Sequence, residues 1–566
     1  MHITCLVPLL VLTGRTLAAI VTYDWSIDWV TAAPDGFSRP VIGINGVWPC
    51  PMIETNVGDT VVVNLKNNLG NETTGLHFHG IRQYGSPEMD GPVAATQCSV
   101  PPGSSFTYQF DTDLPGTFWY HSHEMGQYPD GLRGPLIVHD PEDPYKSEVD
   151  EEIILTVSDW YHNQSIPLVQ NMLQPSNTLF IPPFPDSLIV NEGGNSIITV
   201  EKGKTYRIRV ISFSALGSAM VNFKDHTMKI IMQDASYITP ASADVIRVAP
   251  AQRYDFLVTM ARNDSGNYPF LVALDINADY TNPSATPQPI TWNYNITGYL
   301  VTDPSASTTS TDLVNVFDVV DDSAFTNLDG EGPLGPVTQN IKLDFNFCFD
   351  NNSIPRACFN GKPYVDQDVP TLYSVATTGD YNTDPTVYGQ VNPQIVEKGA
   401  IVELVVNNLD VALHPFHLHG HQFQVIERPA SGAGTWPGTT SPSANPAFKD
   451  TVTVNGASYA VIRFQADNPG VWLFHCHIEW HVEMGLTATI IEAPEELRGL
   501  TIPQDHIDVC KIQGSPYEGN AAGNTKDYTN TAGMNFVNPP IYTGALWEPT
   551  ATPTPKLRAR VVRKRW

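Results

Sequence analysis

Two stretches near opposite ends of the chain repeat each other, and they restrict the fold more than any other feature. The segment LPGTFWYHSH at 114–123 aligns without gaps with NPGVWLFHCH at 468–477. Upstream, VGDTVVVNLKNNL leads to HFHG as EKGAIVELVVNNL leads to HPFHLHG, and VEKGKTYRIRVIS at 200–212 repeats this pattern without a nearby H-x-H pair. The first and last parts of the chain are therefore expected to be copies of one domain, with a third domain between them.

Strand-like patterns dominate the rest of the sequence. Short runs rich in Val, Ile, Tyr and Phe alternate with Gly, Pro, Asn and Asp turns, and the 47 prolines suit turns and strand edges. We therefore predict an all-β protein of several sandwiches or barrels, with domains at 20–145, 146–330 and 331–510. A signal peptide at 1–19 precedes them, and a C-terminal extension at 511–566 follows them.

The stretch HCHIEWHVEMGL at 475–486 places a cysteine between two histidines. Neighbouring side chains of a strand point to opposite faces, so His475 and His477 share one face and Cys476 takes the other. A thiolate with histidine partners suits copper, which predicts two metal sites joined by one short piece of backbone. Ser122 occupies the position of Cys476 in the first copy, and a hydroxyl cannot replace the thiolate. Only the last domain is therefore expected to carry a copper–thiolate site.

Ten of the 16 histidines gather in four short clusters. The clusters are His77/His79, His121/His123, His414/His417/His419 and His475/His477/His481. Solvated or structurally satisfied strand faces are the alternative, but an H-x-H pair aims both rings to one side and is a strong metal signal. We expect His414 and His481 to complete the site of Cys476. The other eight histidines, four from each terminal domain, could hold three copper ions at the interface of those domains.

The charge argues against two classes of partner, and the N-terminus predicts an exported protein. The net charge of −28 argues against nucleic acid and anionic membranes as partners, because both favour basic surfaces. The apolar run Ile3–Leu12, followed by Ala18 and Ala19, predicts a secretory signal, with a buried N-terminal strand as the alternative. No other stretch approaches a transmembrane length, so we expect a protein secreted outside the cell or into its wall, without a membrane anchor. Five N-x-S/T sequons predict glycosylated loops. They begin at Asn71, Asn163, Asn263, Asn295 and Asn351.

The cysteines suit an oxidising compartment. Once the signal-peptide cysteine and Cys476 are set aside, five of the seven remain, which allow two bridges and one thiol at most. Cys348 and Cys358 flank the turn-like FDNNSIPRA and could close a hairpin. A bridge between Cys98 and Cys510 would tie the first third of the chain to its end. The sequence alone leaves this connectivity open.

The four motifs HFHG, HSH, HPFHLHG and HCHIEWHVEMGL resemble those of the multicopper oxidases, and within them the fungal laccases and ferroxidases, from about residue 25 to 510. The resemblance implies three cupredoxin-like Greek-key β domains and four copper ions, one of type 1, one of type 2 and a type 3 pair. Electrons from the substrate would pass one at a time through the type 1 site to the other three coppers, where O₂ becomes water. The implied type 1 ligands are His414, Cys476 and His481. The implied type 2 ligands are His77 and His417, and the type 3 ligands are His79, His121, His123, His419, His475 and His477.

The same resemblance implies roles near the copper ions for three further residues. Leu486 stands at the axial position of the type 1 copper, where it cannot ligate and should raise the reduction potential, while Met484 is expected to pack. Asp90 and Glu479 match acidic positions that assist protonation near the copper cluster. The alternatives are a turn residue for Asp90 and a solvated side chain for Glu479.

Laccases and ferroxidases share the same copper ligands, so the substrate must be predicted from the residues around His414 and His481. Asp410 matches a position that guides Fe(II) in fungal ferroxidases, although a turn carboxylate is the favoured alternative. Pro183 stands near the place where ferroxidases carry a glutamate. Asp186, in the same loop, matches a carboxylate that accepts a phenolic proton in laccases.

The missing glutamate, the absence of an anchor and the run HSHEMGQYPDGLRGPLIVHDP favour a secreted laccase-like enzyme of ascomycete type. We therefore predict a monomer that couples oxidation of small phenols to O₂ reduction, in pigment or secondary-metabolite synthesis. A ferroxidase is the first alternative, and a copper store or electron carrier is the non-enzymatic one. Ascorbate oxidation has no feature that selects it. The chain ends in VVRKRW instead of the Asp-Ser-Gly-Leu of many ascomycete laccases.

Overall fold

The computed structural model describes residues 18–193, 197–262, 267–275, 295–308, 318–534, 536 and 544–548, and the backbone of 563–565. The predicted signal peptide, apart from Ala18 and Ala19, lies outside the described residues, as do the sequon at Asn263 and most of the basic C-terminal tail.

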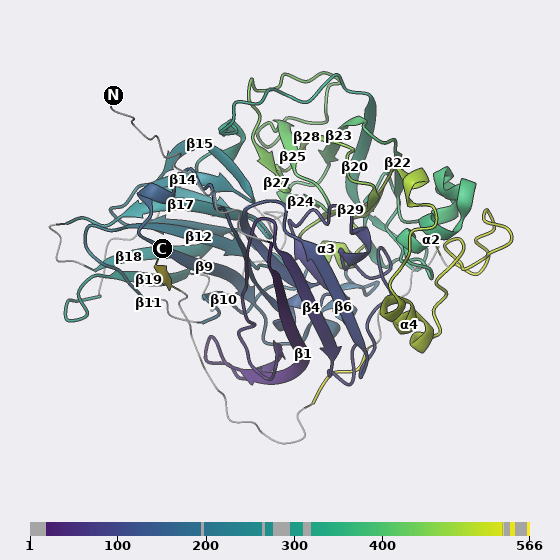
Figure 1. Cartoon of the computed structure of the whole chain (residues 1–566), viewed down its shortest axis with the longest axis horizontal. Helices are drawn as coiled ribbons and strands as arrows, with labels where there is room; N and C mark the ends of the chain where they lie inside the picture. The colour runs from purple at the N-terminus through teal and green to yellow at the C-terminus, as the bar shows by residue number, and fades with distance from the viewer. Residues whose placement is uncertain are drawn as a thin grey trace, which may run out of the picture.

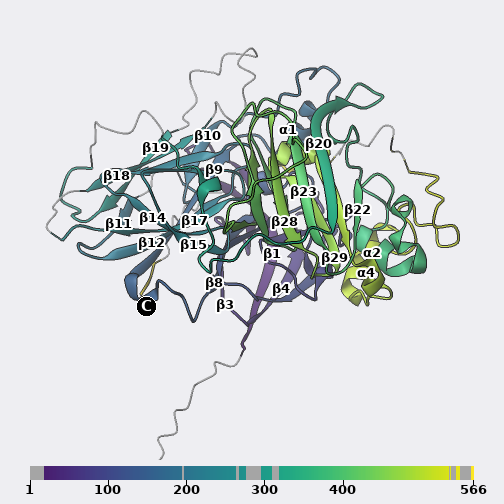
Figure 2. The same ribbon diagram turned by 90° about the horizontal axis from the view of Figure 1, so that it is seen from above.

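Six β-sheets pair into three sandwiches, which confirms the all-β prediction. Figure 1 shows them as purple, teal and green groups of strands, and in Figure 2 the strands of the middle domain lie to the left of those of the last domain. The sandwiches occupy residues 20–139, 151–301 and 339–492. The predicted domain limits at 145, 330 and 510 lie outside these strands and stay predictions.

The first domain packs a sheet of order β2-β1-β4-β6 against one of order β3-β8-β7-β5. Its strands are β1 (Ile20–Ala32), β2 (Arg39–Ile44), β3 (Ile53–Asn56), β4 (Thr60–Asn67), β5 (Leu76–His79), β6 (Ser105–Asp111), β7 (Gly116–Ser122) and β8 (Arg133–His139). In β4, buried residues alternate with more exposed ones, because only one face of its sheet meets the core. In β7 every residue is buried, because this strand lies between the core and the neighbouring domains.

The middle domain contributes sheets of order β10-β9-β12-β17-β14-β15 and β11-β19-β18-β13-β16. Its strands are β9 (Glu151–Trp160), β10 (Ser187–Val190), β11 (Ile197–Thr199), β12 (Thr205–Ser212), β13 (Ala219–Phe223), β14 (Met228–Gln233), β15 (Ser236–Ala243), β16 (Val245–Val248), β17 (Arg253–Thr259), β18 (Tyr268–Leu274) and β19 (Asn295–Val301). A short strand near the C-terminus, β31 (Arg563–Arg565), pairs with β9. Helix α1 (Ser165–Met172) follows β9.

The last domain contributes sheets of order β21-β20-β23-β28-β25-β26 and β22-β30-β29-β24-β27. Its strands are β20 (Gln339–Phe349), β21 (Pro355–Phe359), β22 (Pro393–Val396), β23 (Ile401–Asn408), β24 (His414–Leu418), β25 (Phe423–Glu427), β26 (Phe448–Lys449), β27 (Thr451–Val454), β28 (Ser458–Gln465), β29 (Gly470–Cys476) and β30 (Thr487–Glu492). Helices α2 (Thr371–Thr377) and α3 (Glu479–Glu483) belong to its loops, and α4 (Gln504–Gln513) follows it.

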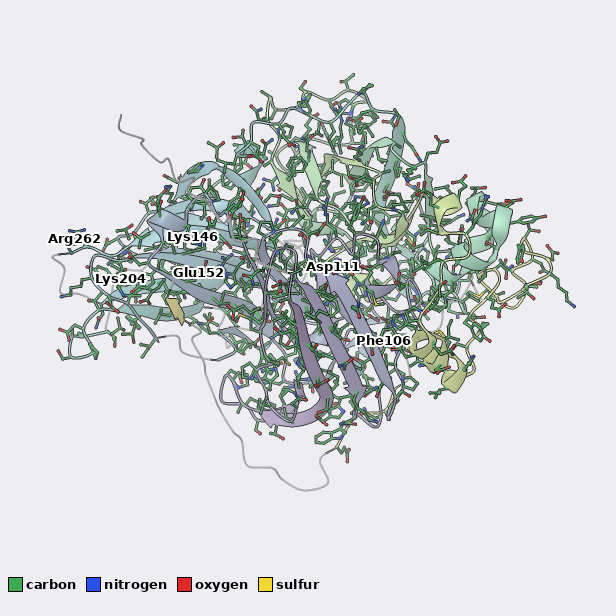
Figure 3. The ribbon with its side chains drawn as sticks, in the orientation of Figure 1. Phe106, Asp111, Lys146, Glu152, Lys204 and Arg262 are labelled. Atoms are coloured by element: carbon green, nitrogen blue, oxygen red, sulfur yellow. A yellow bond between two sulfur atoms is a disulfide. The ribbon has the colours of Figure 1, made fainter. Side chains whose placement is uncertain are left out.

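Two disulfides confirm the suspected pairings. Cys348–Cys358 joins β20 to β21, and Cys98–Cys510 fastens α4 to the first domain. Phe106 of β6, labelled in Figure 3, stacks on the His506 ring of α4 with ring centres 3.8 Å apart. The end of the last domain is thereby held against the first, and the two domains that carry the histidine motifs are adjacent.

The C-terminal extension continues from α4 along the last domain, at the right of Figure 1. Farther on, Trp547 stacks on Trp29 of β1 with ring centres 5.5 Å apart, and its backbone exchanges two hydrogen bonds with Gln164. Among the described residues, no helix is both long enough and apolar enough to cross a bilayer.

Candidate metal centre

The histidine motifs lie on paired strands. In the first domain β5 pairs with β7, so that His77 stands opposite His121. In the last domain β24 pairs with β29, so that His417 stands opposite His475. Because residues directly opposite each other in an antiparallel pair share one face of the sheet, each domain gathers its two H-x-H pairs on one side.

The two domains turn these sides toward each other. The ring of His77 stacks on His419 with centres 4.0 Å apart, and that of His79 stacks on His417 at 3.7 Å. The rings of His123 and His475 lie 5.3 Å apart. One group of eight rings therefore forms at the domain interface, and we call it the histidine cluster. Its members are His77, His79, His121, His123, His417, His419, His475 and His477.

Hydrogen bonds leave ring nitrogens of the histidine cluster available for metal. The Nδ1 atoms of His77, His121 and His475 are hydrogen-bonded to main-chain carbonyls at 2.8–2.9 Å. By contrast, several buried ring nitrogens have no hydrogen-bond partner. They are Nε2 of His77, His121 and His417, Nδ1 of His79 and both ring nitrogens of His477. Unpartnered buried polar atoms are costly, and metal coordination would satisfy them.

The donor set and its charge state fit copper. Ligand atoms lie within 4.8 Å of one another in three groups of the histidine cluster. These groups are His77/His79/His417, His79/His121/His477 and His123/His419/His475. Burial, reinforced by neighbouring imidazoles, holds the pKa of His79 and His419 well below the usual range. These rings are therefore neutral at pH 7 and can ligate.

A second group, which we call the cysteine site, consists of His414, Cys476 and His481. The Cys476 sulfur lies 3.8 Å from Nδ1 of His414 and 3.7 Å from Nδ1 of His481. The end of β29 supplies the cysteine, the start of β24 supplies one histidine and α3 supplies the other. One sulfur and two imidazole nitrogens in a buried site suit a copper–thiolate centre.

Apolar residues enclose the cysteine site. Leu486 and Met484 are fully buried in the same core as Cys476, and the Leu486 carbonyl accepts a hydrogen bond from the Cys476 amide at 3.1 Å. The ring of Phe347 lies 5.3 Å from that of His481. The Leu486 backbone is thus hydrogen-bonded to Cys476. The axial role of its side chain stays a prediction.

The two predicted proton donors are both buried, Asp90 against the histidine cluster and Glu479 two residues after His477 in the chain. Oδ2 of Asp90 accepts a hydrogen bond from Nδ1 of His419 at 2.8 Å across the domain interface, and Oδ1 lies 3.3 Å from Nδ1 of His77. Glu479 begins α3 and is 7% exposed, so it is not the solvated side chain of the alternative. Burial, together with neighbouring Glu483, raises the pKa of Glu479 well above its usual value.

The fold places the two carboxylates that were predicted to act on the substrate in different surroundings. Asp410 contacts the cysteine site, because its Oδ2 lies 3.0 Å from Nε2 of His414 while 22% of its side chain is exposed. Asp186 instead accepts a hydrogen bond from the His162 amide at 2.7 Å, and its own amide binds the Trp160 carbonyl. The loop that carries Asp186 reaches the surroundings of the cysteine site through Phe180, whose ring stacks on Phe347.

Two buried residues in contact with the site were missed by the sequence analysis. Asp450 contacts His79 and His417, and Arg253 of the middle domain binds Asp450. Neither residue belongs to a histidine motif. A single Asp in FKDTVTV and a single Arg in AQRYDF carry no spacing signal, so only the packed structure identifies them.

Sequence profiles described as multicopper oxidase match residues 26–143, 151–293 and 364–496. This chain belongs to the multicopper oxidase family. Members are copper-dependent oxidoreductases that use O₂, so the predicted enzyme class is confirmed, as are four copper ions, one of type 1, one of type 2 and a type 3 pair.

Several relatives of this multicopper oxidase are named for iron. The chain is 47% identical over 536 residues to the iron transport multicopper oxidase fetC of Epichloe festucae, covering 93% of this chain and 85% of that relative. It is 43% identical over 526 residues to the iron transport multicopper oxidase FET3 of Gibberella zeae, covering 92% and 83%.

Solved structures confirm the cupredoxin-like fold of this multicopper oxidase. The crystal structure of Fet3p, a multicopper oxidase that functions in iron import, superposes with a TM-score of 0.87 at 35% identity, covering 91% of this chain and 99% of that one. A laccase from Botrytis aclada superposes with a TM-score of 0.77 at 26% identity, covering 88% and 93%.

The predicted phenol oxidation is therefore wrong, and the role in pigment or secondary metabolism is not supported. The relatives and the Fet3p structure favour the ferroxidase alternative over the laccase one. The physical reason is visible at Asp186, whose carboxylate binds the His162 backbone, while Asp410 is the carboxylate bonded to the cysteine site. The missing glutamate at Pro183 therefore does not separate a laccase from a ferroxidase in this chain.

Proposed function

We propose that this multicopper oxidase oxidises Fe(II) to Fe(III) and passes the electrons to O₂. The observation that carries the proposal is the 3.0 Å contact between the Asp410 carboxylate and Nε2 of His414. A partly exposed carboxylate bonded to the cysteine site suits a small cation, which needs oxygen ligands and a short path for its electron. The iron transport relatives support the same substrate.

The copper ligands are proposed from the geometry of the two sites. The cysteine site would hold the type 1 copper, with Leu486 at its axial position. His77 and His417 would hold the type 2 copper, and the other six members of the histidine cluster would hold the type 3 pair. The grouping of ligand atoms within 4.8 Å supports this division.

Bound copper supplies one-electron oxidation at the cysteine site and four-electron reduction of O₂ at the histidine cluster. Cys476 lies directly between His475 and His477 in the chain, so a covalent path of one residue on each side joins the two sites. Four Fe(II) ions give up four electrons, and one O₂ takes them with four protons to form two waters. Asp90 and Glu479 would deliver protons to the histidine cluster, and Asp410 would hold the Fe(II) ion next to His414.

Export is proposed for the same protein. Two disulfides form in the described part of the chain, and disulfides persist in oxidising compartments. The signal peptide and the monomeric state stay predictions.

Steady-state oxygen consumption of the copper-loaded protein tests the proposal, with Fe(II) compared against hydroquinone. We expect a higher kcat/KM for Fe(II), and Asp410→Asn should lower it by about tenfold while hydroquinone oxidation stays unchanged. Asp113→Asn is the matched control, since its side chain is 28% exposed and is paired with Arg82 in the first domain. A higher kcat/KM for hydroquinone, or an equal loss for both substrates in Asp410→Asn, would reject the proposal.

A further inference from the structure

Arg253, at the start of β17, extends from the middle domain into the interface of the other two. Its side chain is fully buried. Its Nη1 and Nη2 atoms donate to the two carboxylate oxygens of Asp450 at 2.8 and 2.6 Å, and its Nε donates to the Thr117 carbonyl of β7 at 2.7 Å. One guanidinium therefore binds the first and the last domain together.

Asp450 in turn binds two rings of the histidine cluster. Its Oδ1 lies 3.2 Å from Nε2 of His79, and its main-chain carbonyl lies 2.8 Å from Nδ1 of His417. The Thr451 hydroxyl lies 3.3 Å from the same two nitrogens. Both contacts leave the opposite ring nitrogen, Nδ1 of His79 and Nε2 of His417, without a hydrogen-bond partner and directed away from Asp450.

Further contacts fix the position of Asp450. Asp234 of the middle domain accepts hydrogen bonds from the Asp450 and Thr451 amides at 3.2 Å each and from the Arg253 amide at 3.1 Å. Gly80, which ends the HFHG motif, leaves room for the pair. A Cβ atom there would lie 2.7 Å from Nη2 of Arg253 and 2.9 Å from Oδ2 of Asp450. The motif glycine, whose φ of +89° also favours glycine, thus leaves room for residues of the two other domains.

We propose that Arg253 and Asp450 are a positioning pair through which the middle domain orients His79 and His417. The described part of the middle domain gives no ring to the histidine cluster, yet its guanidinium fixes the carboxylate that accepts from His79. A hydrogen bond to the outer nitrogen selects the tautomer whose inner nitrogen is free to bind metal. Copper at the first- and last-domain interface consequently depends on docking of the middle domain. This inference rests on the copper ligands and not on the preference for Fe(II).

Copper retention tests the proposal in the copper-loaded full chain. An amide at position 450 replaces one carboxylate oxygen with an NH₂ group, which cannot accept from Arg253, and it removes the negative charge that the guanidinium pairs with. Lysine at position 253 loses the planar two-pronged contact with the carboxylate and the Nε–H that donates to the Thr117 carbonyl. In Asp450→Asn and Arg253→Lys we expect affinity for copper at the histidine cluster to fall by about 10–100-fold in a chelator competition. The type 2 paramagnetic signal should fall with it, while the visible thiolate band of the cysteine site should remain.

Asp255→Asn is the matched control. Asp255 is also fully buried, binds Arg209 at 2.6 Å and contacts Thr117, but it touches no histidine. Arg209 also binds Glu152, which Figure 3 labels in the middle domain. This control should lower the unfolding temperature and leave copper affinity unchanged.

Two outcomes would overturn the proposal. One is unchanged copper affinity and type 2 signal in Asp450→Asn and Arg253→Lys, and the other is an equal loss of copper in Asp255→Asn. If Asp450→Asn or Arg253→Lys does not fold, Thr451→Val provides a milder test, because it removes the hydroxyl that donates to Oδ1 of Asp450 at 2.9 Å and lies near His79 and His417. A type 2 signal identical to wild type in that variant would then count against the pair.

Discussion

The first and last domains have the same backbone hydrogen bonding around Ser122 and Cys476, the two residues that the repeat aligns. In the first domain the Ser122 amide donates to the Leu132 carbonyl at 3.0 Å, and in the last the Cys476 amide donates to the Leu486 carbonyl at 3.1 Å. Ser122 stands opposite Leu76 in the strand pair, and Cys476 stands opposite Phe416. The two residues are therefore structural counterparts, as the sequence repeat predicted.

At these equivalent positions the two domains differ only in their side chains. Thr74 precedes Leu76 by two residues, as His414 precedes Phe416, and Gln127 follows Ser122 by five residues, as His481 follows Cys476. The Thr74 and Ser122 hydroxyls donate to Oε1 of Gln127 at 2.7 and 2.8 Å. The first domain thus keeps the triangular arrangement of the cysteine site with hydroxyls and an amide. A hydrogen-bonded triangle serves packing, while a thiolate and two imidazoles serve electron transfer, so the fold does not fix the chemistry.

Cys476→Ser gives the last domain the residue of the first, and it should have the largest effect. We expect complete loss of Fe(II) oxidation and of the visible thiolate band, with copper falling from four ions per chain to three, because a hydroxyl does not bind as a thiolate does. Copper analysis and absorption spectroscopy measure both. Cys50→Ser is the control, since Cys50 is also buried but bonds only to main-chain carbonyls. Oxidase activity retained in Cys476→Ser would contradict the assignment.

The reverse exchange, Thr74→His with Ser122→Cys and Gln127→His, should create a second thiolate site. We expect one additional copper per chain and a stronger visible band, because the backbone positions already match. Larger side chains in a packed core should cost about 1–3 kcal/mol of unfolding free energy. Ser122→Cys alone should bind no additional copper. A folded triple variant that binds no more copper than wild type would show that the backbone match is insufficient.

Leu486→Met tests the axial position and should have a smaller effect. Methionine can approach the copper where leucine cannot, so the reduction potential of the type 1 site should fall. The exchange conserves volume and should cost less than about 1.5 kcal/mol of unfolding free energy. Redox titration of the visible band measures the shift. Leu132→Met makes the same exchange in the first domain and should leave the potential unchanged. An equal potential in Leu486→Met and wild type would remove Leu486 from the axial position.

Glu72 accepts a hydrogen bond from Gln127 of the first-domain triangle at 2.9 Å. This carboxyl group should make the unfolding free energy of the protein depend on pH. Burial, with nearby Asp130, raises the pKa of Glu72 to about 7. Between about pH 4.5 and 7 the folded chain keeps a proton that the unfolded chain has lost, so stability falls as the pH rises. Glu72→Gln cannot ionise, and its unfolding free energy relative to wild type should therefore be higher at pH 8 than at pH 5, by about 1–3 kcal/mol. Denaturant unfolding at the two pH values checks this, and no pH-dependent difference would contradict it.

The site was largely predictable because its ligands come in local patterns. Strand alternation places both rings of an H-x-H pair on one face, and the repeat places two such pairs in each terminal domain. Asp90 was found through its motif, and the structure places it against His419. Asp450 and Arg253 could not be found in this way, since each acts on residues that are distant in sequence and neither has a characteristic spacing.

The sequence by itself determined the all-β class, the duplicated terminal domains, the types of metal ligand and the single cysteine site. These depend on residue identity and on short-range periodicity, which a linear chain displays directly. Only the tertiary structure decided how the first and last domains face each other, which nitrogens stay unpartnered, and that Asp410 rather than Asp186 contacts the cysteine site. The first two of these outcomes depend on the packing of three domains and on contacts between residues hundreds of positions apart. The third depends on where the loop of Asp186 packs, since Asp410 lies only four residues from His414. No local pattern in the chain records them.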